Sequence, residues 1–491
     1  MRLTQFTIEG LGHLSALIAD DDAGVAAVVD PRRDVDVYLG AARAEGLAIT
    51  HVVETHLHND YVSGGRELAA LTGATHVIGV GAELRYEHRP LGDGETFDVG
   101  SLRFATLDTP GHTPEHVSYA VSDRSRADEP LLLLTGGSLL VGAVGRTDLL
   151  GSENAIPYAR QMYHSIHDVI LGHEDSVAIY PTHGAGSLCS TGIASTSWST
   201  IGFERRHNRL LAPMEVDAFA RALLRGQPSF PRYFARMRPT NQAGPRLLGG
   251  VVPLPRPLQV ADAHSAVEHG ALVLDLRTGA EHATGHIPGS LSIPAGTSFG
   301  TWLGWVVPDP DRPLILVLRT SDDWDDATRQ ALRIGFEHVT GYVLGGYPAW
   351  AEAGFPTEVG GALEVTELAT ILERGGPDAP LVIDVRQASE FEAGHLPGAV
   401  PIGAGDLPDR LDELPRDRPI ATICAGGYRA SVGASLLRAA GFENVLWVSG
   451  GVPTWQASGF PTEYGLGDTT ADWPPVDEPA SPTPGAEVHA H

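Results

Sequence analysis

The second half of the chain repeats itself, and this repeat limits the folds available to it. The segment Leu274–Arg277 (LDLR) returns as Ile383–Arg386 (IDVR), and Gly285–Ser290 (GHIPGS) returns as Gly394–Ala399 (GHLPGA), each 109 positions later. Each copy begins with an apolar, strand-like run and continues with helical patterns. Alternating strand and helix patterns are typical of α/β domains with parallel sheets. The sequence therefore predicts two tandem α/β domains.

The first 210 residues differ from the repeats, because they combine short apolar runs, clustered histidines and a glycine-rich middle. A chain of 491 residues has room for about three domains, and 42% hydrophobic residues are enough for folded cores. An arginine- and proline-rich stretch separates the first part from the repeats, and the end of the chain has few apolar anchors. We therefore predict a first domain over 1–212, a linker extension over 213–256, the two repeats over 257–360 and 361–466, and a disordered tail over 467–491.

Charge and cysteine content narrow the partners and the compartment. With 61 acidic and 34 basic residues the formal net charge is −27, which repels phosphate backbones and anionic lipids. We expect neither nucleic acid nor a membrane as partner. The two cysteines form no disulfide framework, and the start of the chain lacks a secretory pattern. These features favour the cytoplasm and leave open whether the chain forms a homo-oligomer.

Histidines of the first domain follow strand-like segments. His56, His58 and Asp60 come after an apolar run that ends at Thr55, while His112 (in DTPGHTPEH) and His183 (in YPTHGAG) each follow a further strand-like stretch. Because α/β folds build their sites at strand ends, these side chains are expected to converge. Imidazole and carboxylate together favour a metal site holding Fe or Zn. The alternative is that each histidine caps a loop or forms a hydrogen bond in a core.

These motifs resemble the metallo-β-lactamase superfamily, with ETHLHNDY for its HxHxDH motif, TPGHT for its PGH loop, TGGSLLVGAVGRTDLLG for its GD turn and YPTHGAG for its late histidine. The resemblance covers about residues 1–210 and implies an αββα sandwich. GRTDLLG and PTHGAGSLC are most similar to the persulfide dioxygenase branch. In that branch one Fe(II) is held by the positions that correspond here to His56, His112 and residue 137.

Two positions depart from this pattern, because Gly137 replaces the aspartate and Tyr61 replaces the last histidine of HxHxDH. The remaining set is His56, His58 and His112, with Asp60 as a ligand or as a partner of a ligand. We expect one divalent metal, Fe(II) first and Zn(II) second. The resemblance implies that a low-molecular-weight persulfide, such as that of glutathione, is oxidised by O₂ to sulfite. A basic contact for the substrate could come from Arg146, Arg205 or Arg206.

A second candidate site lies in the second repeat, where the strand-like ATI ends at Ile423 and is followed by CAGGYR. Here Cys424 begins a glycine-bearing loop, and a helical pattern begins at Ala430. Inward-pointing amides and the positive end of that helix would stabilise the thiolate. The alternative is a buried structural cysteine.

CAGGYR resembles the CxxGxR loop of the rhodanese sulfurtransferases, and the resemblance covers about residues 365–465. It implies that Cys424 and Arg429 are catalytic, that Gly426, Gly427 and Tyr428 bind the substrate, and that thiosulfate or sulfite takes part. Asp384 and Arg386 are predicted to form a structural pair at a strand end. The first repeat has Arg319–Asp323 where the loop should be and has no thiol there, so we predict a scaffold or interdomain spacer that cannot form a persulfide, with a hidden binding site as the alternative. Cys189 is expected to be structural, with a sulfur-receiving role as the alternative.

Together these features predict an enzyme of persulfide metabolism, with metal-dependent persulfide oxidation coupled to sulfurtransferase chemistry at Cys424. Two other functions remain open. The first is a glyoxalase II-type thioester hydrolase. The second is a sulfurtransferase or sulfur carrier whose first domain has lost its metal.

Overall fold

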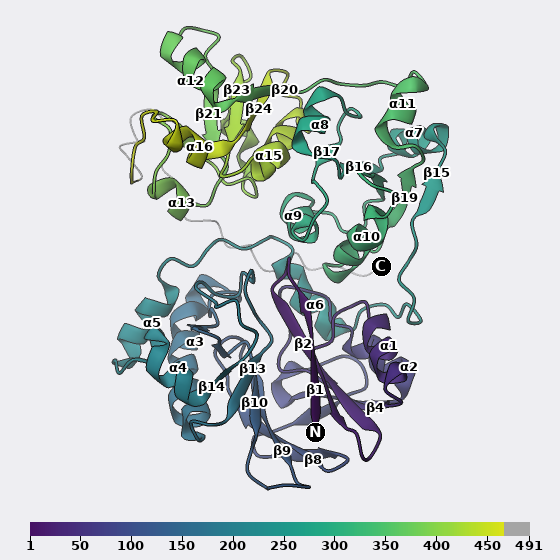
Figure 1. Ribbon diagram of the computed structural model, residues 1–491, viewed down its shortest axis with the longest axis vertical. Coiled ribbons are helices and arrows are strands. Elements are labelled where there is room, and N and C mark those ends of the chain that lie inside the picture. Colours follow the sequence, from purple (N-terminus) through teal and green to yellow (C-terminus); the bar gives the residue numbers. More distant parts are fainter. Residues whose placement is uncertain (466–491) are drawn as a thin grey trace, which may run out of the picture.

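The computed structural model describes residues 1–465, so the predicted disordered tail (467–491) lies outside the described residues. The first domain occupies the lower part of Figure 1, and the two repeat domains lie above it. The three units follow one another along the chain, as the repeat pattern predicts.

Two six-stranded sheets form the first domain. Their inner faces pack together through apolar side chains, among them Val29 and Val53 of the first sheet and Phe104 and Val121 of the second. The first sheet is ordered β1 (Arg2–Ile8), β2 (His13–Asp20), β3 (Val25–Val29), β4 (Ala48–Val53), β5 (Thr75–Gly79), β6 (Arg89–Leu91). The second is ordered β14 (Ser199–Thr200), β13 (Ala178–Pro181), β10 (Leu132–Gly136), β9 (Val117–Asp123), β8 (Leu102–Asp108), β7 (Thr96–Val99), with a separate pair β11 (Leu139–Leu140) and β12 (Ala143–Val144).

Helices cover the outer faces of both sheets. Tyr38 of α1 (Asp36–Ala44) and Leu68 of α2 (Gly65–Thr72) pack on the first sheet. Met162 of α3 (Ser152–His164), Ile201 of α4 (Ile201–His207) and Phe219 of α5 (Val216–Leu224) pack on the second. Short helical turns complete the unit: η1 (Val80–Ala82), η2 (Ser165–Val169), η3 (Ile170–Gly172) and η4 (Arg209–Leu211). This arrangement is the predicted αββα sandwich.

The segment expected to be a linker is largely structured. It contains α5, which belongs to the core of the first domain, and α6 (Phe234–Ala243), whose Phe234 and Met237 pack between the first domain and the first repeat. Composition pointed to a connector because proline and arginine are frequent there, but Phe219, Phe234 and Met237 are buried.

Each repeat folds around a five-stranded, wholly parallel sheet, which confirms the predicted α/β class. The first is ordered β15 (Arg256–Leu258), β19 (Val339–Val343), β18 (Leu314–Val317), β16 (Leu272–Asp275), β17 (Leu291–Ser292), with α7 (Val260–Glu268), α8 (Gly279–Thr284), α9 (Phe299–Val306), α10 (Asp323–Arg333) and α11 (Gly346–Glu352). The second is ordered β20 (Gly361–Glu364), β24 (Val445–Ser449), β23 (Ile420–Ile423), β21 (Leu381–Asp384), β22 (Val400–Pro401), with α12 (Val365–Arg374), α13 (Ala388–Glu392), α14 (Leu407–Arg410), η5 (Leu411–Glu413), α15 (Tyr428–Ala439) and α16 (Gly451–Ala457).

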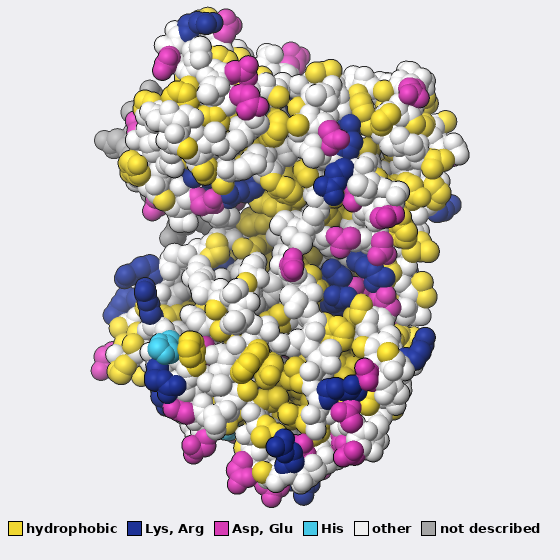
Figure 2. Space-filling view, viewed as in Figure 1, with side chains coloured by type: hydrophobic (Ala, Val, Ile, Leu, Met, Phe, Trp, Pro, Cys, Tyr) yellow, Lys and Arg dark blue, Asp and Glu magenta, His cyan; other side chains and the backbone are white. Residues whose placement is uncertain are grey.

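The first repeat docks on the first domain through the end of α10. Arg333 donates a bidentate pair of hydrogen bonds to the buried Asp34, and Arg329 pairs with Asp36. The Arg333 carbonyl also accepts a hydrogen bond from the amide of Val62 at 2.7 Å. Figure 2 shows acidic and basic side chains interspersed along the right side of this junction. Among the described residues, no helix is both long and apolar enough to cross a membrane.

Candidate metal centre and cysteine loop

Loops at the ends of strands bring three histidines of the first domain together. His56 follows β4, His112 lies between β8 and β9, and His183 follows β13. Their ring centroids are 4.9 Å (His56–His112), 5.3 Å (His112–His183) and 5.5 Å (His56–His183) apart. All three are at most 1% exposed. Side chains 127 positions apart in sequence therefore surround one point.

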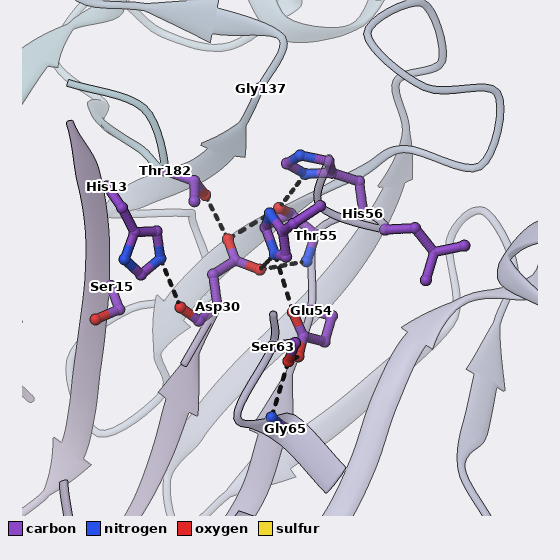
Figure 3. A network of polar contacts seen from close by, with 12 residues as sticks. His13, Ser15, Asp30, Glu54, Thr55, His56, Ser63, Gly65, Gly137 and Thr182 are labelled. Carbon is purple, nitrogen blue, oxygen red and sulfur yellow. Dashed lines mark hydrogen bonds and ion pairs between the residues drawn. The ribbon is translucent and has the colours of Figure 1, made fainter. Parts of the chain in front are cut away.

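His56 is anchored by a chain of hydrogen bonds. The buried Asp30 carboxylate accepts the Thr55 hydroxyl at 2.9 Å and the Thr55 amide at 2.8 Å, and the Thr55 oxygen lies 2.9 Å from His56 Nδ1. Since the hydroxyl proton goes to Asp30, Nδ1 of His56 is the donor to Thr55 and Nε2 carries the lone pair. Figure 3 shows the His56 ring on the far side of Thr55 from Asp30. Burial lowers the pKa of His56 well below its usual value, and neighbouring histidines lower it further. His56 is therefore neutral and has a fixed tautomer, with the lone pair on Nε2.

His58 turns its Nε2 toward two buried carboxylates, 3.0 Å from Glu54 and 3.2 Å from Asp30. Burial alone would lower the pKa of His58, but Asp30 and Glu54 raise it to about 10. Its Nδ1 is buried without a hydrogen-bond partner among the described residues. A buried nitrogen without a partner is costly. Because Nε2 faces the two carboxylates, Nδ1 is the nitrogen of His58 that could hold a cation once the ring has lost a proton.

His112 has its Nδ1 2.8 Å from the carbonyl oxygen of Arg146, to which it donates. This bond leaves Nε2 as the ligand nitrogen. Burial and the nearby His183 lower the pKa of His112 to about 3, so the ring is neutral. A further histidine of the same motif, His116, instead accepts the Gly137 amide with its Nε2 at 2.8 Å and is committed to structure.

His183 joins the site, although the sequence prediction left it out of the ligand set. Its Nε2 lies 3.4 Å from His56 Nε2, and its Nδ1 lies 3.3 Å from Asp60 Oδ2. Two imidazole nitrogens that face each other need a proton or a metal ion between them. Two nitrogens bound to one tetrahedral metal at 2.0–2.1 Å lie about 3.3 Å apart, whereas hydrogen bonds are usually shorter. The spacing fits a shared metal ion.

Asp60 supports His183. The carboxylate is 2% exposed, and neither oxygen has a hydrogen-bond partner among the described residues beyond the ion-pair contact with His183. Burial would raise the pKa of Asp60, but His183 and other histidines hold it well below its usual value. A buried, charged carboxylate behind an imidazole is the arrangement that orients metal-binding histidines.

The structure accounts for the two departures from the family pattern. A side chain at Gly137 would begin 2.2 Å from His112 Cδ2, so the His112 ring fills the room that an aspartate would need. Tyr61 stacks on His58 with ring centroids 4.4 Å apart and donates its hydroxyl to the Asp30 carbonyl. Both positions support neighbouring histidines and supply no metal-binding atom.

The segment 213–256 forms hydrogen bonds to the loop between β4 and α2 that carries His56 and His58, called the histidine loop (54–64). Asn241 of α6 donates to the carbonyls of His58 and Tyr61, and its oxygen accepts the amide of Ser63. The Tyr233 hydroxyl donates to the Asp60 carbonyl at 2.9 Å. These contacts could not be predicted from the sequence, because they depend on the tertiary packing of α6.

The three arginines considered as substrate contacts are engaged elsewhere. Arg146 is 2% exposed and donates to Asp148, to Leu188 O and to Pro228 O. Arg205 and Arg206 both pair with Asp175 on the surface. The Arg146 carbonyl contacts His112, but none of these interactions brings a guanidinium group to the histidine cluster.

In the second repeat Cys424 directly follows β23 and is 1% exposed. The Gly427 amide donates to its Sγ at 3.1 Å, which is the inward amide expected from the sequence. Helix α15 begins at Tyr428, two residues before the predicted start, so Arg429 lies in its first turn. Gly427 has a φ of +89°, a conformation that favours glycine. The cradle around the sulfur therefore depends on this residue.

The other predicted residues of this loop have different surroundings. Arg429 forms a bidentate pair with Glu390, at 2.5 and 2.7 Å. The Tyr428 hydroxyl donates to Pro294 O of the first repeat at 3.1 Å, so it contacts the neighbouring domain. An added Cβ at Gly426 would meet nothing within 4 Å. Arg386 donates to Asp384 and to Gly394 O, which is the predicted structural pair.

The corresponding loop of the first repeat is filled by its own carboxylate. The amides of Arg319 and Thr320 both donate to Asp323 Oδ2, at 3.1 and 2.8 Å, and the Thr320 hydroxyl donates to Oδ1. The loop amides thus bind an internal anion where the second repeat holds Cys424.

Comparisons with known proteins agree with this architecture. The rhodanese-like domain family matches residues 259–353 and 364–458. A hydroxyacylglutathione hydrolase of Methylococcus capsulatus is 37% identical over 239 residues, covering 45% of this chain and 91% of that protein. A mitochondrial persulfide dioxygenase of Mus musculus is 30% identical over 177 residues, covering 34% of this chain. The chain spans 62% of the length of that relative.

Among solved structures, a metallo-β-lactamase from Staphylococcus aureus superposes with a TM-score of 0.62 and 32% identity, covering 70% of this chain and 98% of its own. That share exceeds the first domain, so the likeness extends into the repeats. The chain belongs to the metallo-β-lactamase superfamily. Within it, the first domain is of the glyoxalase II and persulfide dioxygenase type and is fused to two rhodanese-like domains.

Proposed function

We propose that this protein is an enzyme of sulfur metabolism that oxidises a low-molecular-weight persulfide at a metal centre in its first domain and transfers sulfane sulfur at Cys424. The rhodanese-like domains and the persulfide dioxygenase relatives support the role in sulfur metabolism. The two free cysteines fit a reducing compartment, and the proposal includes a cytoplasmic location.

The orientation of the histidines carries the first half of the proposal. His56 and His112 each have one ring nitrogen hydrogen-bonded to the protein, which leaves the other for a ligand. His58 Nδ1 lacks a partner, and His183 Nε2 faces His56 Nε2. Side chains that only packed in a core would have their polar atoms satisfied. We assign His56, His58, His112 and His183 as the nitrogen ligands of one divalent metal, with Fe(II) ahead of Zn(II) for oxygen chemistry.

The residues of the site hold and orient, and they contribute no nucleophile to the oxidation. A bound Fe(II) would activate O₂ next to the substrate sulfur. The overall reaction is balanced as RSSH + O₂ + H₂O → RSH + SO₃²⁻ + 2H⁺. Asp30 and Thr55 keep the His56 proton on Nδ1, and Asp60 fixes the orientation of His183. The buried ring cluster excludes water from the reacting sulfur.

Sulfur transfer uses the second repeat. The Cys424 thiolate would attack the outer sulfur of thiosulfate, form a Cys–S–S⁻ persulfide and release sulfite. The Gly427 amide and the start of α15 stabilise the negative charge on sulfur in both states. Arg429, held by Glu390, contributes positive charge near the loop. Because both sites lie on one chain, sulfite and sulfane sulfur could pass between them at high effective concentration.

A thioester hydrolase of glyoxalase II type is the second candidate, because the hydrolase relative is covered over 91% of its length. Hydrolysis would use a metal-bound hydroxide. Two replacements speak against it. This hydrolase type normally uses the aspartate that is missing at 137 and the histidine that is missing at 61; glycine has no side chain, and the Tyr61 hydroxyl is donated to Asp30 O.

Oxygen uptake tests the proposal. Metal-loaded protein given glutathione persulfide should consume O₂ and form sulfite, and Cys424→Ser should lose thiosulfate:cyanide sulfur transfer while oxygen uptake continues. Thioester cleavage without oxygen uptake would favour the hydrolase. If neither reaction occurs in protein shown to contain metal, the first domain has no such activity and only the sulfurtransferase remains.

A further inference from the structure

The histidine cluster lacks the negative charge that the family places at residue 137. Four imidazoles bring no negative charge to the metal itself, and the buried carboxylates of Asp30, Glu54 and Asp60 contact only the far nitrogens of His58 and His183. The His112 ring occupies the space beside Gly137, so no carboxylate can lie there. The anionic ligand must come from another residue.

Cys189 lies beside two of these histidines. Its sulfur and one ring nitrogen each of His112 and His183 all lie within 4.8 Å of one another, and the residue is 1% exposed. The Arg146 peptide links the parts of this group, because its amide donates to Cys189 O at 2.8 Å while its carbonyl accepts from His112 Nδ1. The backbone of Cys189 and the ring of His112 are thus held by one peptide.

The carboxylates near the cluster lie differently: Asp30 and Glu54 contact Nε2 of His58, and Asp60 lies beside His183. It contacts His183 Nδ1, which is the ring nitrogen on the opposite side from His56. Among the described residues, the compact groups of three potential ligands include Cys189 with His112 and His183, whereas Asp60 belongs to none of them. Asp60 therefore suits a role behind His183, whereas the Cys189 sulfur lies within 4.8 Å of a ring nitrogen of both His112 and His183.

From this geometry we propose that Cys189 binds the metal through its thiolate, taking the place of the carboxylate missing at Gly137. The inference rests on the proposed metal centre. The site then presents nitrogen and sulfur ligands and prefers borderline divalent ions such as Zn²⁺, Co²⁺ and Fe²⁺ over Mg²⁺ or Mn²⁺. Binding replaces the thiol proton with the metal, and the proton is released to solvent.

Optical titration with Co²⁺ tests the assignment, with metal content measured separately on the same samples. Wild-type protein should bind Co²⁺ with a thiolate-to-metal charge-transfer band in the near ultraviolet. Cys189→Ser should lose the band and bind Co²⁺ about tenfold more weakly or worse. Cys424→Ser, which removes the other cysteine, is the matched control and should keep both band and affinity. A full complement of Co²⁺ without the band, or a band that persists in Cys189→Ser, overturns the inference.

X-ray absorption of Zn-loaded Cys424→Ser gives a second measurement that does not depend on folding of the Cys189 variant. In that protein Cys189 is the only cysteine, so one sulfur neighbour at about 2.3 Å from zinc supports the inference. A shell of nitrogen and oxygen alone refutes it and leaves the histidine centre intact. Failure to bind any metal would instead count against the proposed centre itself.

Discussion

Replacing Asp30 with asparagine should weaken the metal centre from a distance, since Asp30 holds the ligands without reaching the metal. The carboxylate accepts the amide and hydroxyl of Thr55, the hydroxyl of Thr182 and Nε2 of His58. Figure 3 shows it at the centre of this network. An asparagine keeps the shape, but its amide group turns a donor toward groups that are themselves donors.

The expected size of the effect follows from these contacts. One of the two oxygens becomes NH₂, so about two of the four hydrogen bonds are lost. Hydrogen bonds to a charged group contribute about 1.5–3 kcal/mol each, which predicts a loss of roughly 3–6 kcal/mol in unfolding free energy. Loss of an outer partner of a ligand usually weakens metal binding about 10–100-fold. We expect a drop within that range for Asp30→Asn.

Chelator competition measures the metal affinity, and urea unfolding measures the stability. Asp20→Asn is a suitable control, because Asp20 is also a buried carboxylate but accepts the amides of Ser101, Asp22 and Ala23 at the far end of β2. It should lower stability and leave metal affinity unchanged. Equal metal affinity in Asp30→Asn and wild type would show that the Asp30–Thr55–His56 chain does not position the ligand.

Three further outcomes are expected. Asp34→Asn leaves the buried Arg333 without its carboxylate partner and should destabilise docking of the first repeat by about 3–5 kcal/mol in urea unfolding. Arg333 lowers the pKa of Asp34 despite burial, so the ion pair stabilises the fold above the ordinary pKa of 3.8 and is lost as the pH falls through the lower folded value. The stabilities of wild type and Asp34→Asn should therefore converge in acid. Glu390→Gln releases the Arg429 guanidinium and should raise KM for thiosulfate about tenfold with a smaller change in kcat, as steady-state kinetics would show. Removal of metal by a chelator should lower the first domain's melting temperature, restored on adding Fe(II) or Zn(II); no change would speak against a metal bound to the folded state.

Fold class could be predicted because it depends on local patterns. Repeated strand and helix signals in the second half indicate parallel sheets, and the structure has them. Convergence of His56 and His112 could also be expected, because both residues follow strands and sites form at strand ends. The two strands, β4 and β8, lie in different sheets of the sandwich. The helix after Cys424 was placed two residues late, since glycine at 427 ends the loop with a positive φ and lets Tyr428 begin the helix.

The finer parts of the site could not be predicted, because they depend on distances across the fold. Sequence spacing does not show that His183 faces His56, or that Asp30, on the preceding strand's end, fixes the His56 tautomer through Thr55. The role of Asn241 was hidden for the same reason, since it lies in a segment whose composition suggested a linker.

The first repeat shows why a domain can keep its fold after its chemistry has gone. Its loop amides bind Asp323, so no external anion is needed to satisfy them, and the start of α10 stays ordered. The other end of α10 accepts the Val62 amide, one residue beyond Tyr61 in the histidine loop. At the end of β17 in the same domain, the amide of Ser292 donates to the hydroxyl of Ser435 in α15, the helix that follows Cys424. The domain therefore contacts elements adjoining both candidate sites, and these contacts need its sheet and helices but no thiol.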